Sequence, residues 1–404
     1  MRGEAVLGSY RVALGTPGAA AFSVAGLVLR LPLAMYPVAM VLLVSLRTGN
    51  YAFGGVLTAA YILGGALGNP LLSRFADRAG QRAVILPAGI AHVLALTVLV
   101  VASAGGAARA TLVGAAALAG LTFPPVGALV RARWAGLPGS SPHQLGTGLA
   151  VESSFDEVTF IVGPVLATGL ATGVGPAAPF VAAGLLVLAG ALALHVQRAT
   201  MPPPGRHSAV PARRLPHAPT AAVVLVMVAV GAALVSIDLA AVAFVGQAGQ
   251  ARWTGAVLAC FALGSGAAGL AYGARRWRSG VESRLRVVAV VFALLPAILL
   301  GAAGVRTLAV QMFVVGIGTA PLLITLFGLI ERYAPAERLT EGLAWLSTGL
   351  NLGAGAAAPL VGAVADAHGA RVAMAIPLAA SVVAGLLALL TVRLARPYLR
   401  PASS

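Results

Sequence analysis

Residues 219–245, PTAAVVLVMVAVGAALVSIDLAAVAFV, form an apolar run in which Asp238 is the single charged residue. A helix that crosses the hydrocarbon core of a bilayer needs about 20 predominantly apolar residues. The length of this run is therefore typical of a membrane-spanning helix.

The composition extends this interpretation to the whole chain. Of the 404 residues, 59% are hydrophobic and 9% are charged, whereas soluble domains carry about 25% charged residues. This balance excludes a large soluble enzyme, and it excludes a disordered chain, which would be polar. Strands of a membrane barrel are about ten residues of alternating polarity, unlike the long continuous runs here. We therefore expect an all-α membrane protein.

Breaks rich in Arg, Pro and Gly divide the chain into apolar runs of similar length. Twelve runs are long enough to span a bilayer. They lie near residues 18–46, 51–73, 83–104, 108–130, 146–172, 176–196, 219–245, 253–274, 287–304, 307–330, 342–364 and 372–392.

The basic residues are all arginine, and their distribution predicts the orientation of the chain. If the N-terminus is cytoplasmic, 21 of the 27 arginines fall on the cytoplasmic side and five on the outer side, with Arg30 inside a span. Cytoplasmic loops of membrane proteins are enriched in Lys and Arg. The sequence thus predicts a multi-pass protein of the cell (plasma) membrane with both termini cytoplasmic. This distribution accounts for the net charge of +16 without a nucleic-acid partner.

A hydrophilic stretch, 197–218, separates the first six predicted spans from the last six. Its sequence, QRATMPPPGRHSAVPARRLPHA, is rich in Pro and Arg and is typical of an extended linker. We expect an N-terminal six-helix bundle (1–196), a cytoplasmic linker (197–218) and a C-terminal six-helix bundle (219–404). Residues 54–68 and 255–269, in the second span of each half, resemble one another. Repeated bundles of this kind are typical of transporters with a central binding site.

The segment SRFADRAGQR, residues 73–82, is placed in a cytoplasmic loop between the second and third spans. It resembles the signature loop of the major facilitator superfamily, written G-x-L-A-D-R-x-G-R-R, and departs from it at Ser73 and Gln81. The resemblance implies two pseudo-symmetric six-helix bundles that rock during transport, and no enzymatic activity. It also implies that the loop latches the two halves in one state. The residues that carry this gating-loop resemblance are Asp77, Arg78, Gly80 and Arg82. A related pattern follows the eleventh span, at Gly362, Asp366, Gly369 and Arg371.

A second motif lies in the fifth span, where Gly163 and Pro164 are similar to the G-P end of a glycine-rich motif of drug/proton antiporters in this superfamily. The arginine which that branch carries within its fourth span has no counterpart here. The charge-poor, alanine-rich spans favour export of an apolar or amphipathic molecule, because a polar substrate such as a sugar would require more Asn, Gln and Trp there.

Charged residues within the spans are the main candidates for function, because a charge at the bilayer centre costs at least about 2.5–3.5 kcal/mol. Arg30 lies in the first span, Glu152, Asp156 and Glu157 in the fifth, and Asp238 in the seventh. Glu152 and Asp156 are four residues apart and share a helix face, so either could pair with Arg30. Such a pair could be purely structural, or an unpaired carboxylate could carry a proton. Glu152 lies near the cytoplasmic end and could instead be solvated. Asp238 lacks an obvious basic partner and is a candidate proton site or a polar residue of the cavity.

Weaker candidates are neutral polar residues that could line a pocket, namely Tyr36, Tyr61 and Asn351. Asn351 corresponds to Asp156 when the fifth span is aligned with the eleventh. A phosphate-binding motif G-x-x-x-x-G-K-[ST] is absent, so ATP-driven transport is excluded. The sequence contains no cluster of Cys or His with metal-ligand spacing, and we expect neither a metal nor a cofactor.

Together these features predict secondary active transport of a small apolar or amphipathic molecule by alternating access, as proton-coupled efflux. The expected partners are the substrate, protons and membrane lipids, and we expect a monomer. Two alternatives remain open at this stage. One is proton-coupled uptake of a metabolite, and the other is a non-transporting receptor or scaffold of the same fold.

Overall fold

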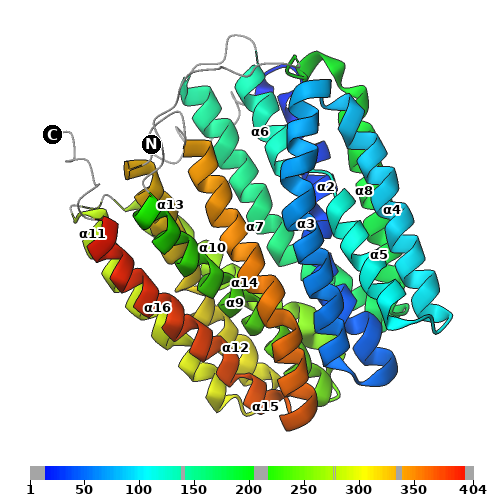
Figure 1. Ribbon diagram of the computed structural model, residues 1–404, viewed down its shortest axis with the longest axis vertical. Coiled ribbons are helices and arrows are strands. Elements are labelled where there is room, and N and C mark those ends of the chain that lie inside the picture. Colours follow the sequence, from blue (N-terminus) through cyan, green and yellow to red (C-terminus); the bar gives the residue numbers. More distant parts are fainter. Residues whose placement is uncertain are drawn as a thin grey trace. The chain divides into compact units, whose positions relative to one another are not determined.

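The computed structural model describes residues 14–137, 142–203, 217–275, 277, 279–333 and 339–395. Within these ranges the regular structure is entirely helical, without a strand (Figure 1). Twelve helical segments are long and apolar enough to cross a membrane. The predicted fold class and the twelve predicted spans are confirmed.

Helices α2 to α8 cover the first six spans. The fourth span is two helices, α5 and α6, because Pro124 and Pro125 interrupt the backbone ladder between them. The elements are α2 (Ala19–Thr48), α3 (Tyr51–Ala79), α4 (Arg82–Ala104), α5 (Arg109–Thr122), α6 (Val126–Gly136), α7 (Pro142–Gly173), α8 (Ala178–Val196) and the short 3₁₀ helix η1 (Arg198–Thr200).

The last six spans contain more breaks. The ninth span starts as α11 at Val281, earlier than the predicted 287, and ends as a 3₁₀ helix. The tenth span is α12 followed by α13. The elements are α9 (His217–Gln247), η2 (Ala251–Trp253), α10 (Thr254–Ala274), α11 (Val281–Leu294), η3 (Leu295–Gly301), α12 (Val305–Gly316), α13 (Thr319–Tyr333), α14 (Leu339–His368), α15 (Ala370–Ala373) and α16 (Ala375–Ala395).

The chain forms two compact units. The first comprises Met1–Ala39 and Leu63–His207, and the second comprises Met40–Ile62 and Ser208–Ser404. Helices α2 and α3 each contribute to both units. The division at a linker of 197–218 into bundles 1–196 and 219–404 stays a prediction, and residues 204–216 of that linker lie outside the described residues.

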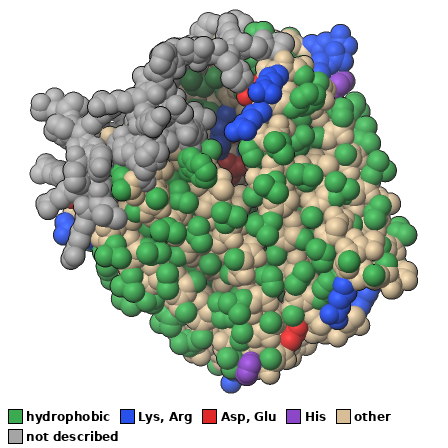
Figure 2. All heavy atoms as spheres, in the orientation of Figure 1, with side chains coloured by type: hydrophobic (Ala, Val, Ile, Leu, Met, Phe, Trp, Pro, Cys, Tyr) green, Lys and Arg blue, Asp and Glu red, His purple; other side chains and the backbone are tan. Residues whose placement is uncertain are grey.

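Large apolar side chains cover much of the helix surface. On α4, Leu94, Val98 and Val101 are more than half exposed and follow one another along one helix face. Soluble proteins rarely expose apolar patches of more than a few hundred Å². In Figure 2 hydrophobic side chains are spread over the visible face, and most charged side chains lie toward its ends. This surface is that of a protein surrounded by lipid.

Glycines allow a close helix contact in the second unit, between α9 and α14 (Figure 1). A Cβ atom added at Gly353 of α14 would overlap the carbonyl oxygen of Val228 in α9. A Cβ at Gly231 of α9 would overlap the carbonyl oxygen of Leu350. Small residues at such positions let helix backbones pack directly in a membrane, where the hydrophobic drive between helices is lost.

This contact leads to a prediction about two glycine-to-alanine changes. Gly353→Ala is expected to destabilise the protein by about 1–3 kcal/mol, because the helices must separate to admit the methyl group. Gly328→Ala in α13 is the matched control, since a Cβ there meets no atom within 4 Å. Alanine is favoured over glycine within a helix by about 0.5–1 kcal/mol, so the control should be neutral or slightly stabilised. Thermal unfolding of the detergent-purified variants measures the difference, and equal stabilities would contradict the packing argument.

Candidate functional site

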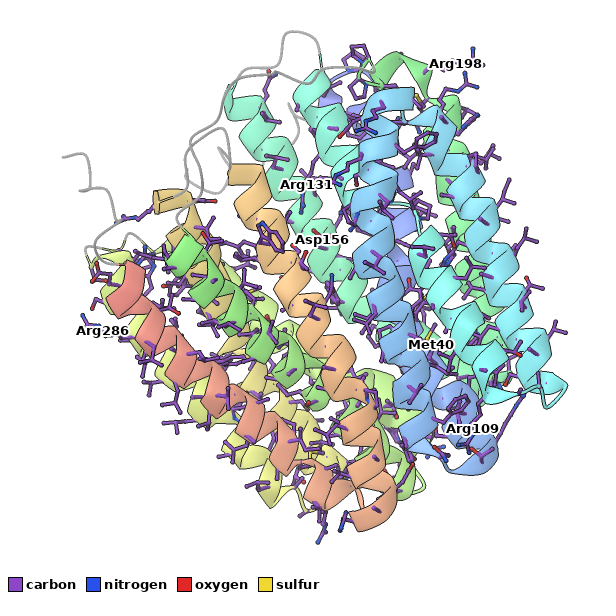
Figure 3. The ribbon with its side chains drawn as sticks, viewed as in Figure 1. Met40, Arg109, Arg131, Asp156, Arg198 and Arg286 are labelled. Carbon is purple, nitrogen blue, oxygen red and sulfur yellow. The ribbon has the colours of Figure 1, made fainter. Side chains whose placement is uncertain are left out.

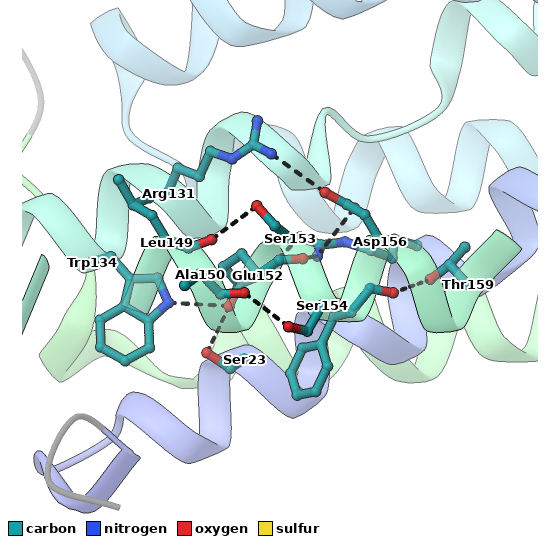
Figure 4. A network of polar contacts seen from close by, with 12 residues as sticks. Ser23, Arg131, Trp134, Leu149, Ala150, Glu152, Ser153, Ser154, Asp156 and Thr159 are labelled. Atoms are coloured by element: carbon teal, nitrogen blue, oxygen red, sulfur yellow. Dashed lines mark hydrogen bonds and ion pairs between the residues drawn. The ribbon is translucent and has the colours of Figure 1, made fainter. Parts of the chain in front are cut away.

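The fifth span, α7, carries a fully buried carboxylate, Glu152. Its Oε1 accepts hydrogen bonds from Ser23 Oγ of α2 at 2.7 Å and from Trp134 Nε1 of α6 at 3.0 Å (Figure 4). Its Oε2 lies 2.9 Å from Arg30 Nη2. Both carboxylate oxygens are therefore partnered by donors. The alternative that Glu152 is solvated is wrong, because its side chain is 0% exposed.

Arg30 of α2 joins Glu152 to a second carboxylate of α7. Its Nη1 donates to the main-chain carbonyl of Glu152 at 3.0 Å and lies 3.3 Å from Asp156 Oδ1. The structure therefore contains both of the ion pairs that the sequence suggested. Arg30 itself is 2% exposed. The α2–α7 approach is close, since a Cβ added at Gly163 would lie 2.8 Å from Ala34 Cβ. These residues all belong to the first compact unit.

Asp156 differs from Glu152 in its exposure. Its side chain is 39% exposed, and its other ionic partner is Arg131 of α6, 52% exposed, at an Nη2–Oδ2 distance of 3.3 Å (Figure 3). Exposed ion pairs contribute about 0–1 kcal/mol, while breaking a buried pair costs about 3–5 kcal/mol. Glu152 is thus buried against Arg30, whereas Asp156 is partly exposed and pairs with both arginines.

Several polar side chains of α7 near this network are exposed, together with the apolar Val158 and Phe160. Ser153, Ser154 and Glu157 are all exposed, within the candidate span Gln144–Gly173. The two serine hydroxyls donate to the carbonyls of Leu149 and Ala150 (Figure 4), which leaves their oxygens able to accept a hydrogen bond. Hydrocarbon offers such groups no partners, so polar residues within spans normally face protein or water. Three polar side chains of this candidate span are therefore exposed where hydrocarbon would offer them no partner.

Two further candidates lie in the second unit. Asp238 of α9 and Asn351 of α14 are each partly buried. Asp238 takes part in none of the ion pairs found within the described ranges. The roles of Asp238 and Asn351 stay predictions.

Tyr36 and Tyr61 are buried rather than exposed to an open pocket. The Tyr36 hydroxyl lies 2.7 Å from His92 Nε2, and His92 Nδ1 lies 2.7 Å from the carbonyl oxygen of Ala119. A carbonyl can only accept, so Nδ1 carries the proton and Tyr36 donates to Nε2. Tyr36 is 0% exposed and Tyr61 is 4% exposed. Both side chains are thus buried, and their predicted role in lining a pocket stays a prediction.

The predicted gating loop is much shorter than expected. Residues 73–79 belong to the last turns of α3, and α4 begins at Arg82. The chain turns at Gly80, whose φ of +88° is a backbone conformation that favours glycine. Asp77, Arg78 and Arg82 are exposed, and Arg82 Nη2 lies 3.2 Å from His195 Nε2. The placement of 73–82 in a loop is wrong, and the latching role of these residues stays a prediction.

Gln81, where the chain departs from the family motif, holds a buried arginine. Its Oε1 accepts from Arg133 Nε at 2.9 Å, and its Nε2 donates to the Leu129 carbonyl at 3.0 Å. Arg133 is 0% exposed. It also donates to the Leu194 carbonyl at the end of α8 and to the Thr200 hydroxyl. An arginine at position 81 would place a second cation against Arg133, so the amide suits this neighbour.

Sequence reasoning missed three residues of the Glu152–Asp156 network. In the sequence, Arg131 looks like one of the many arginines of cytoplasmic loops. Trp134 looks like an aromatic residue of the membrane interface. Ser23 gave no signal beyond being a small polar residue in a span. Within the described residues no group of three or more His, Cys, Asp or Glu side chains is placed to hold a metal ion.

Comparisons with known proteins place the chain among transporters of one fold. The sequence profile of the Major Facilitator Superfamily matches residues 21–274 and 221–404. A search of curated protein sequences finds no match.

Several solved structures share the fold. A point mutant of the nucleoside transporter NupG has a TM-score of 0.73 at 11% identity, covering 92% of this chain and 99% of that one. A bacterial homologue of the human lysosomal transporter Spinster, inward-facing and unoccupied, has a TM-score of 0.69 at 12% identity and covers 96% and 100%. A bacterial metal transporter has a TM-score of 0.62 at 17% identity and covers 92% and 98%.

Proposed function

The chain belongs to the major facilitator superfamily, and from this premise we propose that it is a proton-coupled exporter of a small amphipathic molecule. Membership of this family implies membrane transport by alternating access, not enzymatic catalysis. The twelve candidate spans make it a multi-pass membrane protein. Placement in the cell membrane with both termini cytoplasmic, as a monomer, is part of the proposal.

The observation that carries proton coupling is the contrast between Glu152 and Asp156. Asp156 is partly exposed and touches Arg30 and Arg131 at 3.3 Å each. When it gains a proton, its attraction for both guanidinium groups is lost. Arg30 then keeps Glu152, and Arg131 loses its partner. Protonation of one residue would thus change the contacts that join α6 to α7, which is what coupling requires.

The exposed polar side chains of α7 support the proposed substrate class. Ser153, Ser154 and Glu157 offer a few polar groups in spans that are otherwise apolar. A binding site for a polar substrate such as a sugar would be expected to contain more Asn, Gln and Trp in the spans. Export is supported by the resemblance of Gly163-Pro164 to the drug/proton antiporter branch.

Proton-coupled uptake is a second candidate, and one observation favours it. Asp156 lies between two arginines, so its protonation would free Arg131 to hold an anionic group of a substrate. The proton and the anion would then bind in the same state and move in the same direction.

Flux into proteoliposomes with an imposed pH gradient tests the proposal. The probes are ethidium, which is permanently cationic, and a sulfonated dye, which is permanently anionic, so that a pH gradient alone redistributes neither. Accumulation of a dye in vesicles with an acidic lumen indicates exchange for protons and supports export. Accumulation from an acidic exterior indicates movement with protons and supports uptake over export. Protein-free vesicles are the control. If neither dye, nor any member of a wider panel of amphipathic compounds, responds to the gradient, the proton-coupled proposal is wrong.

A further inference from the structure

A carboxylate near the end of α14 caps the first turn of α3. Asp366 Oδ1 accepts from the main-chain nitrogen of Tyr51 at 2.9 Å, and Oδ2 accepts from that of Ala52 at 2.7 Å. The first N–H groups of a helix have no partner within it, and the positive end of the helix dipole favours an anion there. Asp366 therefore stabilises the α3 start against α14, although 315 residues separate it from Tyr51.

Gln247, the last residue of α9, adds two hydrogen bonds beside this cap. Its Nε2 donates to the Ala365 carbonyl at 3.0 Å, and its Oε1 accepts from the Ala370 main-chain nitrogen at 2.8 Å. Gln247 thus fixes the end of α9 to the turn between α14 and α15. Asp366 and Gln247 together join three helix ends.

Glycines bring the backbones into contact around the cap. A Cβ atom added at Gly362 of α14 would overlap the Tyr51 carbonyl, and one at Gly55 of α3 would overlap the Ala358 carbonyl. A Cβ at Gly246 of α9 would overlap the Tyr51 hydroxyl. The start of α3 therefore packs on α14 backbone to backbone, and on α9 through the Tyr51 side chain.

The segment held in this way, Met40–Ile62, includes the C-terminal part of α2, the N-terminal part of α3 and the turn between them. It belongs to the second compact unit, as do α9 and α14. The rest of α2 and the rest of α3 belong to the first unit. Both helices therefore run from one unit into the other, and this segment is the part of them that belongs to the second unit.

We propose that Asp366 is a gate residue: its cap on α3 holds the 40–62 segment on α9 and α14 in one state of the transport cycle, and the contact breaks in the other. The proposal rests on alternating access, which the family implies, and not on the identity of the substrate or the coupling ion.

The surroundings of Asp366 suit a contact that breaks and re-forms. Its side chain is exposed, and a pocket of about 500 Å³ lies beside it, lined by polar residues that include Thr48, Asn50 and Gln247. Water can therefore solvate the carboxylate when it leaves α3. Glu152, by contrast, is fully buried and could not lose its partners without leaving an unpaired charge in the protein interior.

Distance measurement between two spin labels tests the proposal. Cys260 is the only cysteine, so labels are placed at Leu46→Cys and Ala248→Cys in a Cys260→Ser background; both native side chains are exposed. Asp366→Ala is expected to shift the ratio of short to long distances about tenfold toward long ones, the size of effect that loss of a helix cap allows. Asp366→Asn retains one acceptor oxygen and should shift it less. Gln247→Leu should shift it in the same direction.

The matched control is Arg306→Gln, which removes an exposed charge at the start of α12 and should leave the distances unchanged. Unchanged distances in Asp366→Ala and Gln247→Leu would overturn the proposal, as would an equal shift in the control. If Asp366→Ala fails to fold, Asp366→Asn and Gln247→Leu decide the question. The measurement needs no substrate or pH gradient, so it can succeed even where the proton-coupled export proposal fails.

Discussion

Replacing Asp156 with asparagine is expected to reduce pH-driven accumulation to the level of protein-free vesicles while the protein still folds and inserts. Asparagine has nearly the same size, and its Oδ1 can still accept from Arg30 or Arg131, whose nitrogens lie 3.3 Å from the carboxylate. It cannot gain or lose a proton in the working range of pH. The change therefore removes the coupling group and preserves most of the packing, and flux in the proteoliposomes described above measures the loss.

Asp238→Asn is the matched comparison, because it neutralises the other candidate proton carrier. If Asp156 carries the proton, Asp238→Asn should keep gradient-driven flux. The reverse pattern would assign coupling to Asp238. Normal flux in both variants would show that these carboxylates are structural and would exclude them from the coupling mechanism.

The fold could be predicted from sequence because the signal for a membrane span is local. The length and composition of each apolar run are enough to predict a span, whatever its neighbours in the fold are. All twelve spans were predicted in this way. The ends of helices were harder to predict, since a helix can continue beyond the hydrocarbon. The charges of Asp77 and Arg78 indicated a loop, yet α3 extends to Ala79. Charge marks where the membrane ends, and it does not mark where the helix ends.

The candidate site was predictable only in part. Arg30, Glu152 and Asp156 were identified because a charge within a membrane span costs free energy. Helix periodicity placed the two acids on one face. The partners that distinguish the two acids come from α2 and α6, and only the tertiary structure brings them together. Trp134 donates to Glu152, whereas Arg131 reaches Asp156. Without these partners, the buried Glu152 and the partly exposed Asp156 cannot be distinguished in the sequence.

The buried pair of Arg30 and Glu152 leads to the second large effect. Arg30→Met is expected to lower the free energy of unfolding by about 3–5 kcal/mol, because it leaves Glu152 buried without its cation. Ser23 and Trp134 would still donate to Oε1, but Oε2 would lose its ion pair. Chemical denaturation of the detergent-purified variant measures the loss.

Two further variants separate a buried pair from a general effect of removing arginine. Arg131→Met breaks the exposed pair with Asp156 and should cost at most about 1 kcal/mol. The double variant Arg30→Met/Glu152→Gln removes both buried charges, and its amide oxygen can still accept from Ser23 and Trp134. It should regain much of the lost stability, since the penalty arises from the unpaired carboxylate. A double variant no more stable than Arg30→Met would contradict this assignment. Recovery would show that the stability lost in Arg30→Met comes from the unpaired Glu152 carboxylate and not from the absence of an arginine as such.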